Sequence, residues 1–173
     1  MNDSGKTADV APLPPRVERV LSAAGLVARC FEPGSTPTSP MAAERLGVEV
    51  GQIAKSIVVK AKNGRYALVL LAGDRRLDDR RLKQLLGAKT RMATAEETEA
   101  VTGYRPGGVC PFDVGPVASD PAHRDVELYI DRSLEAWPTI YPAAGTDASG
   151  VPTTFAQLRQ LVGAEECDVA QGV

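Results

Sequence analysis

The chain has 173 residues, 43% of them hydrophobic and 24% charged, with a formal net charge of -2. This length fits one domain whose core needs no metal or disulfide to hold it. The charge balance excludes a generally basic nucleic-acid binder, so a polyanionic partner has to be met by a local patch. The cysteines Cys30, Cys110 and Cys167 show no C-x-x-C spacing, which argues against a zinc site or disulfide framework and fits a reducing cytoplasm.

Residues 1–14 lack an apolar signal core, and we expect a disordered lead-in there, followed by one folded domain over residues 15–173. No apolar run is long enough to span a membrane. We therefore expect a cytoplasmic protein.

Five segments have apolar residues at helical spacing, a capping residue before them, or a glycine where the pattern stops. In the second of these, we expect Ser39 to cap the helix and Pro40 to occupy its first turn. Thr94 and Thr154 begin capping boxes. The predicted helices lie at residues 17–24, between 39 and 47, around 82–86, from 94 to about 103, and around 155–162.

Seven segments are typical of strands because β-branched and apolar residues crowd them. Asn63–Gly64 predicts a hairpin turn between two of these strands. The order of elements shows no regular βαβ alternation, so we expect an α+β domain with a mixed, largely antiparallel sheet surrounded by helices. The predicted strands lie at residues 27–31, 51–60, 65–72, 88–92, 126–130, 139–143 and 165–169.

Lys55 stands among apolar residues on one face of the strand G-Q-I-A-K-S-I-V-V-K. The other face, which carries Ala54, Ser56, Val58 and Lys60, is the one we expect to meet water. A buried ammonium has to find a partner, lower its pKa or face a cavity. The alternative is that Lys55 extends along the strand's start to reach solvent.

The segment G-Y-R-P-G-G-V-C-P-F, residues 103–112, contains adjacent glycines within a longer loop. Glycines allow close approach of the backbone to a ligand, and the N–H groups of such a loop can bind a phosphate or stabilise an oxyanion. A plain tight turn is the alternative, and the Gly-Gly pair alone does not decide between the two.

Four blocks in this order resemble the YbaK/ProX family of free-standing aminoacyl-tRNA deacylases, relatives of the editing domain inserted in bacterial prolyl-tRNA synthetases. They are A-A-E-R-L-G-V-E-V-G-Q-I-A-K-S-I-V-V-K at 42–60, L-A-G-D-R-R-L-D at 71–78, T-G-Y-R-P-G-G-V-C-P-F at 102–112 and Y-P-A-A-G-T at 141–146. The resemblance spans residues 27–170 and implies a mixed sheet wrapped by helices, as the patterns also predict.

The resemblance implies hydrolysis of the ester of mischarged tRNA in trans. The sequence contains no metal-ligand cluster, P-loop or dinucleotide fingerprint, so we expect no cofactor or metal. The resemblance also implies that Lys55 is the essential lysine, and that Gly107 and Gly108 open a G-x-x-x-P loop that holds the terminal adenosine and the ester. We expect these glycines to supply N–H groups to the oxyanion. Residues implied to bind the substrate are Thr38, Ser39, Ala42, Val109, Cys110, Pro111 and Gly145.

Three alternatives stay open at this point. The same pocket can hold an aminoacyl-adenosine-like ligand without turnover, as a regulator or partner of prolyl-tRNA synthetase. It can also hydrolyse another small ester or amide. Cys110 can act as a covalent nucleophile, although His123 is not marked as its base.

Some relatives carry a histidine in the segment matching residues 146–150 that selects alanine; T-D-A-S-G stands here, so that route is in doubt. The amino acid removed, the tRNA and the oligomeric state are not readable from the sequence. The arginine-rich segment from Arg75 to Lys83 contacts tRNA in one interpretation and is a solvated helix face in the other. For Trp137 and Tyr141, packing is favoured over base stacking.

Overall fold

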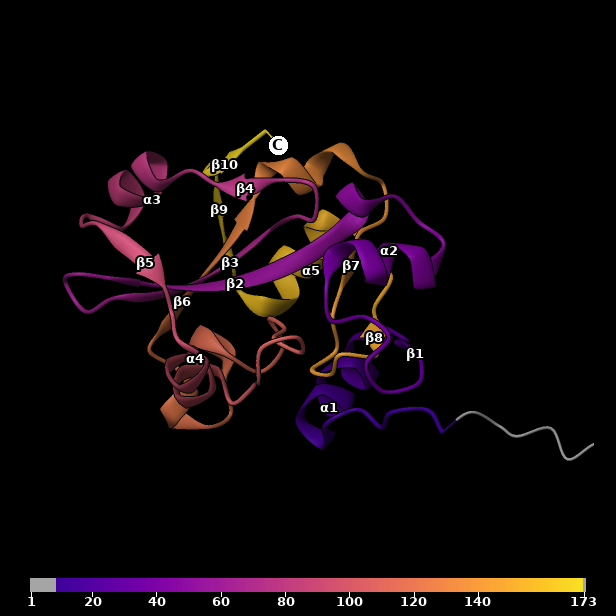
Figure 1. The fold of residues 1–173 in the computed structure, drawn as a ribbon. Helices are drawn as coiled ribbons and strands as arrows, with labels where there is room; N and C mark the ends of the chain where they lie inside the picture. The colour runs from indigo at the N-terminus through magenta and orange to yellow at the C-terminus, as the bar shows by residue number, and fades with distance from the viewer. Residues whose placement is uncertain (1–8, 173) are drawn as a thin grey trace, which may run out of the picture.

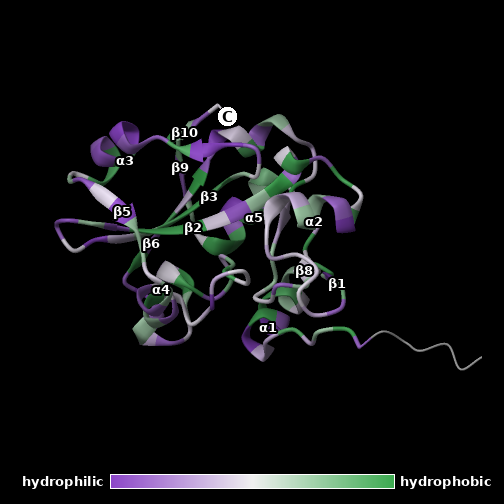
Figure 2. Cartoon of the chain, in the orientation of Figure 1, coloured by the Kyte–Doolittle hydropathy of each residue, from purple (hydrophilic) through white to green (hydrophobic). Residues whose placement is uncertain are grey.

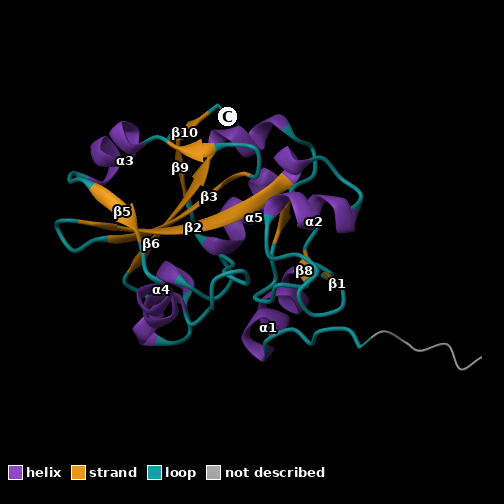
Figure 3. Ribbon diagram, viewed as in Figure 1, coloured by secondary structure: helices purple, strands orange, loops and turns teal. Residues whose placement is uncertain are grey.

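The computed structural model describes residues 9–172, and its helices lie where the sequence predicts them (Figure 3). The helices are α1 (Pro15–Ala24), α2 (Ser39–Leu46), α3 (Asp79–Leu86), α4 (Ala95–Thr102) and α5 (Phe155–Val162). The strands are β1 (Arg29–Cys30), β2 (Ile53–Ala61), β3 (Tyr66–Ala72), β4 (Arg76–Leu77), β5 (Thr90–Met92), β6 (Val126–Asp131), β7 (Tyr141–Pro142), β8 (Ser149–Gly150), β9 (Glu165–Cys167) and β10 (Ala170–Gln171).

Side-chain caps fix where the helices begin. The hydroxyls of Thr94 and Thr154 accept from the backbone N–H groups of Glu97 and Gln157, which is the N-cap half of each predicted capping box. In α2 the cap is Thr38 rather than Ser39, which is the first residue inside the helix. The prediction was one residue late because Thr and Ser are adjacent here and both are favourable caps.

The main sheet is mixed, and its longest strand, β2, crosses the middle of the molecule (Figure 1). The strand order is β5-β2-β3-β6-β9, with β7 paired to β2 as well. The β2–β3 hairpin and the β2–β5 pair are antiparallel, whereas β6 runs parallel to β3 and to β9. The predicted α+β class is therefore confirmed, with helices around a mixed sheet.

The prediction that this face of β2 meets water is wrong for Ala54 and Val58, which are buried, whereas Ser56 and Lys60 on the same face are partly exposed. Ala54 and Val58 are 2% and 5% exposed and belong to the main core with α1 and α5. The opposite face packs against α3 through Val59 and Ala61. Figure 2 shows the resulting apolar colour along the central strands. The small residue Ala54 was misleading because it is packed in the core, and Ser56 because it lines a cavity.

The expected lead-in over residues 1–14 lies partly outside the described residues. Within the described part, the N–H of Ala11 donates to the carbonyl of Phe31 at 2.9 Å. Leu13 packs against the main core. Residues 11–14 are thus attached to the domain, and α1 follows directly.

Candidate functional site

A break in the edge of the main sheet creates the site. Because β3 occupies one edge of β2, both β7 and β5 pair with the other edge. β7 pairs with Ile53 and Ala54, and β5 pairs with residues 59–61. The N–H of Ala93 donates to the carbonyl of Val58, which leaves residues 55–57 uncovered on this edge.

A cavity of about 240 Å³ opens at this break. Four parts of the chain surround it: α2 with the loop before it, β2, the glycine loop, and the segment around β7. Six of the predicted site residues meet in its lining, namely Thr38, Ser39, Ala42, Lys55, Gly107 and Val109. The cavity is smaller than the ~300–1,000 Å³ typical of drug-sized ligands, so it suits a small group such as an aminoacyl moiety.

Lys55 is half-buried and lines both this cavity and a neighbouring hollow beside α3. Its Nζ donates to the carbonyl of Gly73 at 3.4 Å and to the carbonyl of Arg75. Burial lowers the pKa of Lys55, and the nearby charge of Asp74 acts in the opposite direction. The ammonium is therefore held at the cavity rim by neutral oxygens, with no carboxylate of the described residues in ion-pair contact.

The glycine loop contains a tight turn built from Arg105, Pro106, Gly107 and Gly108. The N–H of Gly108 donates to the carbonyl of Arg105 at 3.0 Å, and Gly107 has φ +92. Proline second and a positive-φ glycine third are the signature of a type II turn. The loop therefore contains the tight turn that was one of the two interpretations. Gly107 of this turn also lines the cavity, so a tight turn and ligand binding are compatible here.

This turn decides which N–H groups of the loop remain free for a ligand. The N–H of Gly108 is used inside the turn, so it is not free for an oxyanion, contrary to the expectation from sequence. Within the described residues, the N–H groups of Gly107 and Val109 have no hydrogen-bond partner. They belong to the two loop residues that flank Gly108 and line the cavity, so they are the available donors.

The other predicted loop residues lie behind the cavity wall. Gly108, Cys110, Pro111 and Gly145 do not line the cavity. A Cβ on Gly108 would lie 3.1 Å from the carbonyl oxygen of Gly145, so this glycine is where the loop packs against the segment after β7. Cys110 is 0% exposed, and burial raises the pKa of its thiol to about 11. A buried thiol in its protonated form argues against the covalent alternative.

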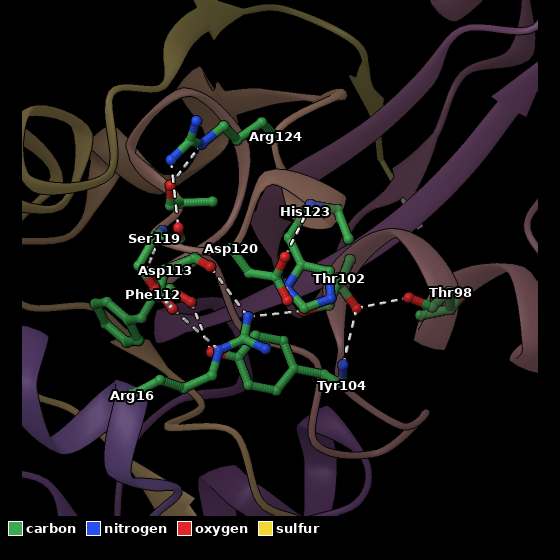
Figure 4. A network of polar contacts seen from close by, with 12 residues as sticks. Arg16, Thr98, Thr102, Tyr104, Phe112, Asp113, Ser119, Asp120, His123 and Arg124 are labelled. Atoms are coloured by element: carbon green, nitrogen blue, oxygen red, sulfur yellow. Dashed lines mark hydrogen bonds and ion pairs between the residues drawn. The ribbon is translucent and has the colours of Figure 1, made fainter.

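Arg16 clamps the ends of the glycine loop, and sequence reasoning missed it (Figure 4). Its Nη2 donates to the carbonyl of Thr102 at 2.7 Å and to that of Asp113 at 3.0 Å, one residue beyond each end of the loop. Its Nε lies 3.4 Å from the Asp113 carboxylate. The guanidinium also stacks on Tyr104, 4.1 Å from the ring centroid, and the Tyr104 hydroxyl donates to the carbonyl of Phe112 at 2.6 Å. We call Arg16, Tyr104 and Asp113 the loop clamp.

Ser56 is a second residue that the sequence did not single out. It lines the cavity, and its hydroxyl oxygen is buried with no hydrogen-bond partner among the described residues. A buried hydroxyl without a partner is costly, which is a signal of a ligand contact. The period-2 pattern of β2 hid it by assigning Ser56 to a solvent face.

The aromatic candidates separate in the structure. Tyr141 lines the cavity from β7, whereas Trp137 packs on Gly51, where a Cβ would lie 2.7 Å from its ring. His123 lies beside Asp120 at 4.0 Å and does not line the cavity. In the arginine-rich segment, Arg75 and Arg81 form ion pairs with Asp74 and Asp168.

The lining also restricts the chemistry. No carboxylate, imidazole or thiol from residues 9–172 contributes to it. In that part of the chain, no group of three or more His, Cys, Asp or Glu side chains is placed to hold a metal ion. None of the helices within it has the length and apolar character needed to cross a bilayer.

Comparison with known proteins places this cavity in a family context. The family model described as "Aminoacyl-tRNA editing domain" matches residues 34–161. The uncharacterized protein YwhH of Bacillus subtilis is 36% identical over 127 residues, which cover 73% of this chain and 76% of that protein. Proline–tRNA ligase of Bacillus licheniformis is 37% identical over 103 residues, 59% of this chain but 16% of the ligase.

Solved structures extend the similarity to the whole fold. The crystal structure of a proposed trans-editing enzyme for prolyl tRNA synthetase superposes with a TM-score of 0.76 at 34% identity, covering 93% of this chain and 100% of that one. The hypothetical protein APE2540 gives a TM-score of 0.76 at 30% identity, covering 90% and 99%. The region matched by the family model includes the cavity lining but not α1, which carries Arg16.

Proposed function

Because this chain belongs to the aminoacyl-tRNA editing domain family, we propose that it is a deacylase that hydrolyses the ester of mischarged tRNA in trans. The observation that carries the proposal is the cavity at the break in β2, which is lined by Lys55 and by Gly107 and Val109, whose N–H groups have no partner within the described residues. This arrangement supports ester chemistry on a small acyl group attached to a polyanion.

The substrate's aminoacyl group enters the cavity with its carbonyl oxygen toward the N–H groups of Gly107 and Val109. Donors that are already oriented stabilise the negative charge that develops on this oxygen during attack. The ammonium of Lys55, held by Gly73 and Arg75, adds a compact positive charge at the rim. There it meets the ester or the terminal phosphate.

Water is the nucleophile in this proposal, since the lining holds no thiol, carboxylate or imidazole within the described residues. A hydroxyl of the terminal ribose or a backbone carbonyl orients this water. Water adds to the carbonyl carbon, the bond to the ribose oxygen breaks, and the oxygen leaves with a proton as the free hydroxyl. The products are a free amino acid and uncharged tRNA.

The same lining favours one other function, a module that binds aminoacyl-tRNA without turnover and assists a synthetase. Its supporting observation is that Lys55 is the one strong cation of the lining and is already engaged by two carbonyls, with no base beside it in residues 9–172. Prolyl-tRNA synthetase is the partner we propose in either case, and the cytoplasm is the compartment.

A deacylation panel separates the two functions. The wild type and Lys55→Ala are each given tRNA charged with Ala, Cys, Ser, Thr or Pro, together with free aminoacyl esters. We expect turnover of one or two charged tRNAs, and a loss of about 10²–10³-fold in Lys55→Ala, the size of effect seen when one oxyanion-stabilising group is removed. Arg80→Ala, on the exposed face of α3, is the matched cation control.

The panel also identifies the substrate, because one methylene changes discrimination by only ~1–3 kcal/mol and several acids must be compared. Turnover at the wild-type rate by a folded Lys55→Ala protein contradicts the role of Lys55. Binding of charged tRNA without turnover of any panel member supports the binding module instead.

A further inference from the structure

A row of like charges crosses the end of the main sheet that lies away from β7. Lys60 on β2 lies directly opposite Arg91 on β5 in the antiparallel register. Beyond this pair, the N–H of Lys62 donates to the carbonyl of Lys89 at 2.9 Å, so two more cations come from adjacent backbone positions. Like charges placed directly opposite each other destabilise a sheet. The fold therefore tolerates a cost at this position.

Within the described residues, only the Lys60 and Arg91 pair has a carboxylate close enough to offset its charge. Glu97 lies 3.9 Å from the Nζ of Lys60 and 3.0 Å from Nη1 of Arg91. No carboxylate of residues 9–172 lies within 4.0 Å of the Lys62 or Lys89 ammonium groups. Both lysines are exposed. Figure 2 shows hydrophilic colour at this end of the sheet.

These four cations line a surface hollow of about 410 Å³ that no acidic residue of the described chain lines. We call Lys60, Lys62, Lys89 and Arg91 the basic groove. The groove shares Thr90 and Arg91 with the hollow beside α3, and that hollow shares Lys55, Ile57 and Met92 with the cavity. Neighbouring depressions thus follow the sheet edge from the cavity to the hairpin, although Lys55 and Lys60 lie on opposite faces of β2.

We propose that the basic groove binds the phosphate backbone of the tRNA acceptor arm while its 3′ end lies in the cavity. This inference rests on the proposed function for its choice of RNA. From Lys55 to Lys62 the strand extends for about 23 Å at ~3.3 Å per residue. This distance leaves room for several phosphates of one strand between the cavity and the groove.

The groove, rather than the arginine-rich segment, meets the requirement for a local patch set by the net charge of -2. In and next to that segment, three aspartates offset part of the charge of five basic residues, and Arg75 and Arg81 form ion pairs with Asp74 and Asp168. The lysines at the hairpin have no such neighbours in sequence from residue 60 to 64. Flexible lysine side chains also suit contacts with phosphates without sequence readout.

The test measures binding of uncharged tRNA by fluorescence anisotropy between 50 and 200 mM salt. For Lys62→Glu/Lys89→Glu we expect about tenfold weaker binding at the lower salt concentration, and a salt-dependence slope reduced by about two. The matched control is Arg19→Glu/Arg132→Glu, which changes the net charge equally at exposed sites outside the groove. The control should keep the wild-type slope.

A second pair of changes, Lys62→Gln/Lys89→Gln, removes attraction without adding repulsion and should give about half of the change in binding free energy. Thermal unfolding checks that each variant is folded. Unchanged tRNA affinity and slope in both groove variants overturn the proposal and leave the groove as a solvated face or a docking site for an acidic protein. An equal loss in the Arg19/Arg132 control also overturns it, because binding then follows net charge.

The experiment stays informative if the proposed function fails. Binding of uncharged tRNA needs no turnover, so a wild type without deacylase activity still tests the groove. If the wild type is active, the ratio of kcat/KM for charged tRNA to that for a phosphate-free aminoacyl ester should fall about tenfold in the groove variants. A preserved ratio in an active enzyme overturns the groove and keeps the deacylase.

Discussion

Lys55 and the glycine turn face the same cavity, but different forces hold them in place. Lys55 is on a strand paired with β3 along its length, and its ammonium is fixed by two backbone carbonyls. The glycine turn lies in a loop without a ladder, and the loop clamp ties its two ends together. A loop that presents backbone N–H groups needs dedicated side chains to stay in position, whereas a strand does not.

Breaking the clamp tests this contrast with the largest expected effect. Arg16→Ala removes two hydrogen bonds and leaves Asp113, which is 7% exposed, without its cation. Removing one partner of a buried pair typically costs ~3–5 kcal/mol, and Ser119 still donates to this carboxylate, so we expect about 3 kcal/mol. Urea unfolding measures the loss of stability.

Activity distinguishes a positioning role for Arg16 from a purely structural one. We expect kcat for deacylation to fall more than KM changes, since the turn donors act on the transition state. Arg16→Lys keeps the charge without the planar fork and should recover stability partly but kcat poorly. Arg19→Ala, exposed on the same helix, is the control. A folded Arg16→Ala protein with wild-type kcat would show that the loop holds its shape without the clamp.

Substituting Gly107 and Gly108 by alanine, one at a time, separates backbone strain from close packing. Each change should lower stability by less than Arg16→Ala does. A Cβ on Gly108 would lie 3.1 Å from backbone atoms of Gly145 and Thr146, so Gly108→Ala should cost about 1–3 kcal/mol and displace the turn. A Cβ on Gly107 would make only ordinary contacts, 3.8 Å from Pro37 and Asp147, but φ is +92, so its change to Ala should cost ~1–2 kcal/mol.

Deacylation and urea unfolding of both variants check this prediction. Gly25→Ala, with φ +69 and nothing within 4 Å, carries the same kind of strain at the end of α1 and should leave kcat unchanged. We expect kcat to fall most in Gly108→Ala, because displacement moves the donors. A larger loss in Gly107→Ala would mean that the turn tolerates the close contact by shifting Thr146.

The sequence predicted those parts of the fold whose causes are local. Capping residues, terminal glycines and the Asn63–Gly64 turn specify the helices and the β2–β3 hairpin within a few residues of chain. The four-block resemblance led to the family because Lys55 and the glycine loop keep their order and spacing.

What the sequence did not predict depends on distant contacts. The burial of Ala54 and Val58 is set by helices elsewhere in the chain, and periodicity cannot tell which face is covered. Arg16 lies 86 and 97 residues from its two carbonyl partners. The role of Gly108 changed because a turn hydrogen bond consumes its N–H, which depends on φ and ψ rather than on residue type.

Ser56 offers the smallest effect and the sharpest contrast between stability and activity. Its hydroxyl is buried in the cavity lining without a partner, so it costs folding energy that a substrate contact would offset. The free energy of unfolding of Ser56→Ala, measured with urea, should therefore equal that of the wild type or exceed it by up to about 1 kcal/mol. A hydrogen bond of ~0.5–1.5 kcal/mol to the substrate predicts that kcat/KM falls about two- to tenfold.

Ser133→Ala is the matched control, because its hydroxyl accepts from the N–H of Ala72 at 3.1 Å and it does not line the cavity. That change should lower stability and leave kcat/KM unaltered, the reverse of Ser56→Ala. If Ser56→Ala loses stability, the hydroxyl has a partner in the folded protein and its cavity role is structural. If stability rises while kcat/KM stays constant, the substrate passes the open edge of β2 without touching Ser56, and the donors of the glycine turn act alone.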